Sequence, residues 1–267
     1  MAINYPGKLI KNGESNSALV RKIQSQLKSI GYQSPQSGDF DDATESAVRL
    51  FQAQHFDMQG NPLIVDGRIG PFTWNRLFNN ISENKLKTTQ APLLAQMLGV
   101  AISQIGVREV PEGSNRGPVV NQYLDSVGIP PNQGTADQRY WCAAFVYWCS
   151  LKAAQGLGRM TPLPKTAGAL DHWKRAATIS GVTRIKKAEA LVNPALIKPG
   201  MIFIQDHGGG AGHTGIVQQT QSARLLTVEG NIAEGAVPGR NGVGVFSTDR
   251  RKLTDNELLG FIDYSQA

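Results

Sequence analysis

The hydrophobic periodicity changes along the chain, and this change constrains the fold more than any other feature. Before residue 80 the apolar residues recur at helical spacing, as in Leu19, Ile23, Leu27 and Ile30. After residue 200 they fall in short runs separated by Gly, Asn and Asp, which is typical of strands. Helices followed by consecutive strands favour an antiparallel sheet. We therefore predict an α+β fold, preceded by a separate all-α region.

The all-α region is predicted to contain three helices. The pattern places them at about Leu19–Ile30, Ala43–Gln54 and Pro71–Phe78. Gly31 follows the first as a C-cap, and the third begins with a proline, which suits the first turn of a helix. The strands of the second region are expected in five apolar runs: Met201–Ile204, Thr214–Gln218, Leu225–Glu229, Val243–Phe246 and Leu259–Tyr264.

A weak internal repeat lies within the helical region. Gly38 followed by Thr44 matches Gly67 followed by Thr73 at the same spacing, and each copy predicts a tight glycine turn before a short helix. A duplicated unit explains this pattern, and so does chance similarity within a generic three-helix bundle. The sequence leaves both interpretations open.

The segments VRKIQSQLKSIGY, GDFDDATESAVRLFQ and VDGRIGPFTWNRL carry a resemblance over residues 17–79 to the peptidoglycan-binding type 1 domain. The glycines of this motif suit positions that need a positive φ. One departure is a longer segment between Gln54 and Asp66. The resemblance implies a non-catalytic domain that binds cell-wall glycan or stem peptide. We predict a binding domain over 1–80, a polar linker over 81–94 and a second domain over 95–267.

Charge and hydropathy limit the classes of partner. The net charge is +6 and the pI about 9.4, which permits a polyanionic partner. The basic residues form no run interleaved with aromatics, so we expect no nucleic-acid binding. No apolar run is long enough for a signal peptide or a membrane span. We therefore expect a monomer that is synthesised in the cytoplasm without a leader.

The chain has two cysteines, Cys142 and Cys149, in the buried-helix pattern WCAAFVYWCS. Two helical turns separate their Cα atoms by roughly 10.5 Å, beyond the roughly 7 Å that a disulfide tolerates. Cys142 begins the apolar run, so it is expected at a helix N-terminus, where the dipole and unpaired N–H groups favour the thiolate. Cys142 is therefore the candidate nucleophile, whereas Cys149 is expected to be a buried structural residue.

A thiolate nucleophile needs a histidine and a third group that orients the imidazole. His213 opens the predicted strand HTGIV, after a glycine-rich loop that we expect to be flexible and to form a flap. Glu229 and Asn231 follow in the next strand, and an antiparallel pairing could place either one beside His213. His207, on the loop itself, is a weaker rival. The remaining histidines, His55 and His172, are expected on helix surfaces.

The order Cys142, His213, Glu229, Asn231 resembles the CHAP family of papain-like amidohydrolases, which is related to NlpC/P60. The resemblance spans most of 95–265 through IGVREVPEGSNRGPVVNQYL, YWCAAFVYWC, KPGMIFI, GHTGIV, VEGN and GVGVFSTDRRKL. It implies that Cys142 attacks an amide, His213 deprotonates it and Glu229 orients His213, while Asn231 supports the histidine or the oxyanion. We expect substrate contacts from four residues in these segments: Glu109, Asn115, Tyr140 and Trp141.

Other kinds of site are disfavoured. A zinc site built from Cys142, Cys149, His207 and His213 would lack the C-x₂₋₄-C knuckle of structural sites. The glycine run before His213 is not followed by Lys-Ser/Thr, so it is no P-loop. No EF-hand calcium pattern is present. We therefore expect neither a metal nor a cofactor.

These features predict a cysteine peptidoglycan hydrolase with a wall-binding domain. An N-acetylmuramoyl-L-alanine amidase is favoured, and an endopeptidase of the stem peptide or cross-bridge is the alternative. A non-catalytic wall-binding protein would not need all four site residues. We expect action in the periplasm or cell wall, either as a phage-type lysin released by a holin or as an antibacterial effector. An effector would have a secretion apparatus and an immunity protein as partners.

Overall fold

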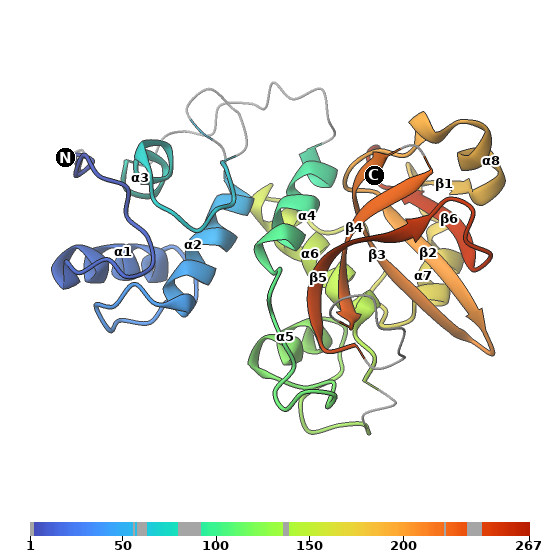
Figure 1. The fold of residues 1–267 in the computed structure, drawn as a ribbon, viewed down its shortest axis with the longest axis horizontal. Helices are drawn as coiled ribbons and strands as arrows, with labels where there is room; N and C mark the ends of the chain where they lie inside the picture. The colour runs from blue at the N-terminus through green and yellow to red at the C-terminus, as the bar shows by residue number, and fades with distance from the viewer. Residues whose placement is uncertain are drawn as a thin grey trace. The chain divides into compact units, whose positions relative to one another are not determined.

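The computed structural model describes residues 3–55, 57, 63–79, 92–135, 139–221, 223–233 and 242–267. The chain divides into two compact units, Met1–Thr89 and Gln90–Ala267, and each is described by itself (Figure 1). The predicted linker lies outside the described residues except for its last three, which belong to the first helix of the second unit.

The N-terminal unit contains the three predicted helices, α1 (Ser17–Ser29), α2 (Asp42–Gln54) and α3 (Pro71–Phe78). The side chains of Asn16 and Asp41 cap α1 and α2 by accepting backbone N–H bonds, and Pro71 opens α3 as expected. The amphipathic faces bury one small core. Its members include Ile10, Val20, Ile23, Leu27, Phe40, Val48, Phe51, Leu63, Ile69, Trp74 and Leu77.

The internal repeat corresponds to a duplicated hydrogen-bond network. Buried Gln24 accepts from the N–H of Gly38 and donates to Thr44 Oγ1 at 2.9 Å. Gln52 accepts from the N–H of Gly67 and donates to the Thr73 hydroxyl at 3.2 Å. In both copies one glutamine amide joins a helix to a glycine turn and to the threonine of the following helix. The two matching networks support the interpretation of a duplicated unit. The sequence repeat was based on glycine and threonine, and the structure adds Gln24 and Gln52 as a third matching pair.

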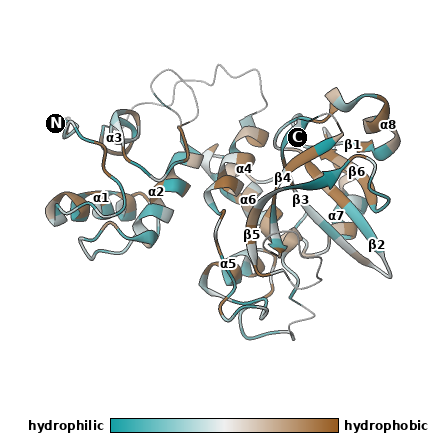
Figure 2. Ribbon diagram, viewed as in Figure 1, coloured by the Kyte–Doolittle hydropathy of each residue, from teal (hydrophilic) through white to brown (hydrophobic). Residues whose placement is uncertain are grey.

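The second unit has five described helices. They are α4 (Pro92–Ser103), α5 (Pro118–Ser126), α6 (Cys142–Gly156), α7 (Ala169–Ala176) and α8 (Lys187–Val192), followed by a 3-10 turn at Pro194–Leu196. Figure 2 shows apolar residues along α4 and α6, the two helices that pack against each other and against the sheet. Within the described ranges, no helix is long and apolar enough to cross a membrane.

The sheet of the second unit is antiparallel and has the order β1-β6-β2-β3-β4-β5. Its strands are β1 (Thr183–Lys186), β2 (Ile202–Gly208), β3 (Ala211–Gln221), β4 (Arg224–Ile232), β5 (Gly244–Lys252) and β6 (Leu258–Asp263). The five predicted strands and the α+β class are confirmed. The edge strand β1 was not predicted, because four residues are too few to display an alternation.

The glycine-rich segment before His213 is a tight β2–β3 hairpin, in which Gly209 and Gly210 have φ values of 62° and 82°. The expectation that it forms a flexible flap stays a prediction. The expectation of a surface position was wrong for His172. His172 is buried, 2% exposed, and its Nε2 lies 2.8 Å from the hydroxyl of Tyr264. His55 is half-buried and stacks on an aromatic ring of the N-terminal core.

The β4–β5 ladder carries two bulges. Between the pairs Leu225–Arg251 and Thr227–Thr248, β5 contains one residue more than β4. Nearer the end of β4, Asn231 is the extra residue, opposite the step from Val245 to Gly244 in β5. Bulges bend a strand and change the direction of the side chains beyond them. These two bulges lie on either side of Glu229.

Candidate active site

Cys142 lies at the N-terminus of α6, as the sequence predicted. It is the first residue of the helix and 5% exposed. Among the described residues no side chain caps α6, and the first turn of the helix has no acidic residue. The backbone N–H groups of this turn therefore have no side-chain acceptor in the described part of the chain, and with the helix dipole they favour a negative charge at the thiol. Cys149 is fully buried, burial raises the pKa of its thiol, and the two cysteines form no disulfide.

His213 connects Cys142 to Glu229. Its Nε2 lies 2.7 Å from Glu229 Oε2, and its ring also hydrogen-bonds the Cys142 thiol. Since Nε2 faces the carboxylate, Nδ1 is the nitrogen left for the thiol. Burial lowers the pKa of His213, but the bonds to Cys142 and Glu229 and the charges of both partners outweigh burial and raise it to about 9. The site therefore favours the imidazolium form of His213.

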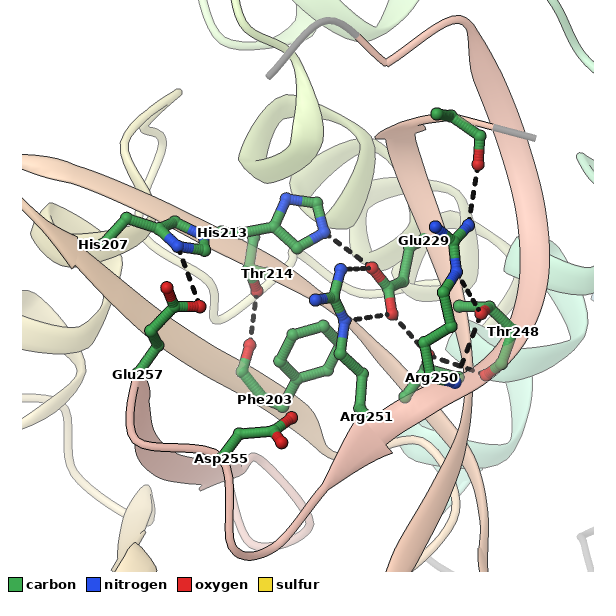
Figure 3. Close-up of polar contacts among 12 residues, drawn as sticks. Phe203, His207, His213, Thr214, Glu229, Thr248, Arg250, Arg251, Asp255 and Glu257 are labelled. Carbon is green, nitrogen blue, oxygen red and sulfur yellow. Dashed lines mark hydrogen bonds and ion pairs between the residues drawn. The ribbon is translucent and has the colours of Figure 1, made fainter. Parts of the chain in front are cut away.

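Glu229 is fully buried and accepts four side-chain hydrogen bonds (Figure 3). Arg251 donates from Nε to Oε1 at 2.9 Å and from Nη2 to Oε2 at 2.6 Å, and Thr227 donates to Oε1 at 2.6 Å. Burial raises the pKa of Glu229, but the bonds from His213 and Arg251 hold it well below its usual range. Gly215 leaves room for this carboxylate, because a Cβ there would lie 2.7 Å from Glu229 Cγ.

Sequence reasoning missed Arg251 and Thr227. A usable signal was the buried carboxylate itself, because a charged group inside a sheet needs a cation nearby. The following strand contains the pair Arg250 and Arg251 in the segment STDRRKL. Its bulge, however, determines which of the two arginines faces Glu229, and the sequence pattern does not reveal a bulge.

Asn231 lies in the second bulge, with a φ of 60°. Asparagine tolerates this left-handed conformation better than most residues, so the backbone gives Asn231 a structural reason to be there. Its side-chain Oδ1 is buried and has no hydrogen-bond partner among the described residues. The preceding Gly230 lets β4 approach α6, because a Cβ there would lie 2.7 Å from Trp141.

The four residues expected to contact substrate occupy different environments. Tyr140 is 38% exposed beside Cys142, and its role in binding stays a prediction. Trp141 is fully buried and donates from Nε1 to Glu109 Oε1 at 2.8 Å. Glu109 also accepts from the N–H of buried Asn115 at 3.0 Å. For Glu109, Asn115 and Trp141 substrate contact also stays a prediction, and their mutual contacts support the start of α6.

His207, the rival base, faces a different partner. Its Nδ1 lies 3.1 Å from Glu257 Oε2, in the half-exposed hairpin (Figure 3). His213, by contrast, is hydrogen-bonded to the Cys142 thiol. The geometry therefore favours His213 as the partner of the cysteine.

Two family models match the chain. The peptidoglycan binding domain model matches residues 16–77, and the CHAP domain model matches residues 134–231. Searches of curated proteins and of solved structures found no match. The CHAP match includes Cys142, His213, Glu229 and Asn231. The chain thus joins a peptidoglycan-binding domain to a CHAP domain, and these two domains support a cell-wall hydrolase that acts on peptidoglycan.

Proposed function

We propose that this protein is a cysteine amidohydrolase that cleaves the N-acetylmuramoyl-L-alanine amide of peptidoglycan. The observation that carries the proposal is the contact chain from Cys142 through His213 to Glu229, within the family match. A thiolate, a positively charged general acid and a buried carboxylate are the groups that acyl transfer from an amide requires. The choice of the muramoyl amide is an expectation from the family resemblance.

The reaction begins with attack of the Cys142 thiolate on the amide carbonyl carbon. The carbonyl π electrons move to oxygen, and the oxyanion forms beside the uncapped first turn of α6, whose N–H groups can stabilise it. His213 gives its proton to the amide nitrogen, the C–N bond breaks and the amine leaves. A thioester to Cys142 remains. Water, deprotonated by neutral His213, then hydrolyses the thioester and restores the thiolate–imidazolium pair.

Asn231 is proposed to assist this reaction by a polar contact of its side chain, either to the histidine or to the oxyanion. Only its amide Nδ2 could donate to an oxyanion, since Oδ1 is an acceptor. Its position two residues after Glu229 in β4 and its buried Oδ1, which has no partner among the described residues, support a role at the site.

The decisive experiment is digestion of purified sacculi, followed by labelling of the new amino termini. An amidase releases the α-amino group of L-alanine. An endopeptidase of the stem or cross-bridge instead releases the amino group of another residue. Neither an amidase nor an endopeptidase releases reducing sugar ends. Cys142→Ala is the matched control, and hydrolysis that persists in this variant would contradict the proposed nucleophile. Absence of any cleavage by the wild type would favour a non-catalytic binding protein.

The N-terminal unit is proposed to hold the enzyme on its insoluble substrate. Tethering raises the local concentration of the catalytic domain without new contacts at the active site. Residues 1–89 have a core of their own and are expected to co-sediment with peptidoglycan. Residues 90–267 should cleave sacculi more slowly than the whole chain. An N-terminal fragment that is folded but stays in the supernatant would refute the tether.

The biological setting is proposed to be wall lysis from the periplasm or cell wall. A phage-type lysin would be encoded beside a holin, whereas an antibacterial effector would be encoded beside an immunity protein and use a secretion apparatus. The neighbouring genes distinguish the two settings. Sedimentation equilibrium tests the proposed monomer.

A further inference from the structure

Arg251 lies outside the segment that matches the CHAP model, yet it makes the most extensive contact to Glu229. Its guanidinium forms two parallel bonds, 2.9 Å to Oε1 and 2.6 Å to Oε2, and its side chain is 22% exposed. A bidentate arginine fixes both the position and the plane of a carboxylate, which a single-point cation cannot do. Glu229 itself is fully buried, so water cannot provide this restraint.

A carboxylate that orients an imidazolium has to keep its negative charge and leave the proton on the histidine. In a dry site, a carboxylate whose only charged partner was His213 would compete for that proton. Arg251 provides a second cation that never gives up its proton. With Arg251 in place, Glu229 can accept a bond from the imidazole without being protonated.

We propose that Arg251 is a positioning residue of the active site, whose two-point contact holds Glu229 in the orientation and charge state that His213 requires. This inference rests on the proposed function, because it assigns Arg251 a part in the same reaction. The site then contains four alternating charges: the Cys142 thiolate, the His213 imidazolium, the Glu229 carboxylate and the Arg251 guanidinium.

The other groups around Arg251 are acidic or apolar. Asp255 and Glu257, from the segment between β5 and β6, attract the guanidinium, although less strongly than Glu229 does. Glu257 is also paired with His207. The ring of Phe203 in β2 lies 5.7 Å from the guanidinium carbon. The ordering of the contacts indicates that the main interaction of Arg251 is with the active site.

Arg250 provides a matched control. It is the neighbouring residue on the same strand and carries the same charge, but it donates to the hydroxyl of Thr248 and to the carbonyl of Ala233 at 2.7 Å. Neither contact involves Glu229 or His213. Arg250→Met therefore removes one positive charge from β5 and leaves the four-charge array intact.

The test measures the rate of Cys142 alkylation by iodoacetamide against pH, with mass spectrometry to identify the modified cysteine, in the whole protein. Loss of a nearby positive charge makes each neighbouring acid hold its proton more tightly. Arg251→Met should therefore move the half-maximal rate to higher pH by about half a unit or more. Arg250→Met should leave it unchanged. This readout does not depend on which bond the enzyme cleaves, or on whether it cleaves any.

Hydrolysis of sacculi provides the second readout. Arg251→Met should reduce kcat by about 10- to 100-fold, because the imidazole is no longer held in one orientation. Arg251→Lys keeps the charge but loses the two-point contact, so it should keep the wild-type alkylation profile and still lose about tenfold in kcat. Wall binding in a sedimentation assay should be unaffected in both variants.

Two results would overturn the inference. One is an Arg251→Met profile that coincides with that of Arg250→Met, with both proteins folded by circular dichroism. The other is wild-type kcat in Arg251→Lys, which also decides the case if the methionine variant does not fold. Absence of hydrolysis in the wild type would refute the proposed function instead, and the alkylation profiles would still test Arg251.

Discussion

Replacing Glu229 by glutamine separates the charge of this residue from its shape. The amide keeps the size of the carboxylate and can still accept a bond from the His213 ring, but it removes the negative charge next to the imidazolium. The pKa of His213 is raised from 6.5 to about 9 by Cys142 and Glu229 together. This difference corresponds to about 3 kcal/mol in favour of the imidazolium. If each partner provides about half, the variant loses about 1.5 kcal/mol of it.

The assay is the pH dependence of kcat/KM on purified sacculi. Activity requires the thiolate and the imidazolium together, so the alkaline limb reports loss of the proton from the pair. In the wild type this limb should lie at about 9, and in Glu229→Gln at about 8. NMR titration of the imidazole nitrogens should show the same displacement. An alkaline limb that stays in place in the folded variant would refute the electrostatic role of Glu229.

The same substitution has a consequence for stability. It leaves the Arg251 guanidinium, which is 22% exposed, without a charged partner at the active site. Removing one partner of a fully buried pair costs about 3–5 kcal/mol, and the partial exposure lowers our expectation to about 2 kcal/mol. Urea denaturation at pH 7 measures this difference.

The sign of the pH dependence follows from the two shifts. The raised pKa of His213 contributes stability that is fully present below 6.5 and is lost as pH rises through about 9. The contribution of ionised Glu229 is fully present above its ordinary pKa of 4.5 and is lost only in strong acid. The difference in unfolding free energy between wild type and Glu229→Gln should therefore narrow between pH 7 and 9, by about 1 kcal/mol.

Four further results are expected. Cys142→Ala should abolish hydrolysis of sacculi with the fold retained, whereas Cys149→Ser should keep most activity; equal loss in two folded variants would contradict the assigned roles. Asn231→Gly keeps the left-handed backbone and removes the side chain. A loss of about 10²-fold or more in kcat would show that the amide of Asn231 assists the reaction. Wild-type activity would show that only the backbone conformation matters. Gln52→Ala should lower the unfolding free energy of the N-terminal unit by about 2 kcal/mol, because it leaves buried partners unsatisfied, and an unchanged urea midpoint would argue against the duplicated network. The wild type should lose about 3 kcal/mol of unfolding free energy as pH falls from 6.5 to 4, because buried His172 resists protonation. His172→Phe should not show this loss, and identical pH profiles of unfolding free energy in the two proteins would contradict the prediction.

The sequence could predict the elements that carry Cys142 and His213. A helix start and a strand start are local features, visible in the position of a residue relative to the apolar run that follows. The antiparallel pairing could place either Glu229 or Asn231 beside His213, and the structure pairs His213 with Glu229. The left-handed backbone of Asn231 could not be predicted.

The remaining features depend on contacts between distant segments. The pattern of its own helix predicts a surface position for His172. The residue is nevertheless buried and hydrogen-bonds the hydroxyl of Tyr264, which is almost a hundred residues later in the chain. Glu109 and Trp141 lie 32 residues apart in the chain and hydrogen-bond each other, a contact that the sequence did not indicate. Register and tertiary pairing decide these cases, and a local pattern contains neither.

The bulge in β5 decides which of two neighbouring arginines serves the active site. Leu225 pairs with Arg251 and Thr227 pairs with Thr248, so Thr248 and Arg251 face the same side although they are three residues apart. In a regular strand the side chains alternate, and residues three apart point to opposite faces. A β5 of the same sequence without the bulge would therefore direct Arg250 toward Glu229 and Arg251 away from it. An alignment of related sequences would show both arginines in either case, although the carboxylate would face a different one.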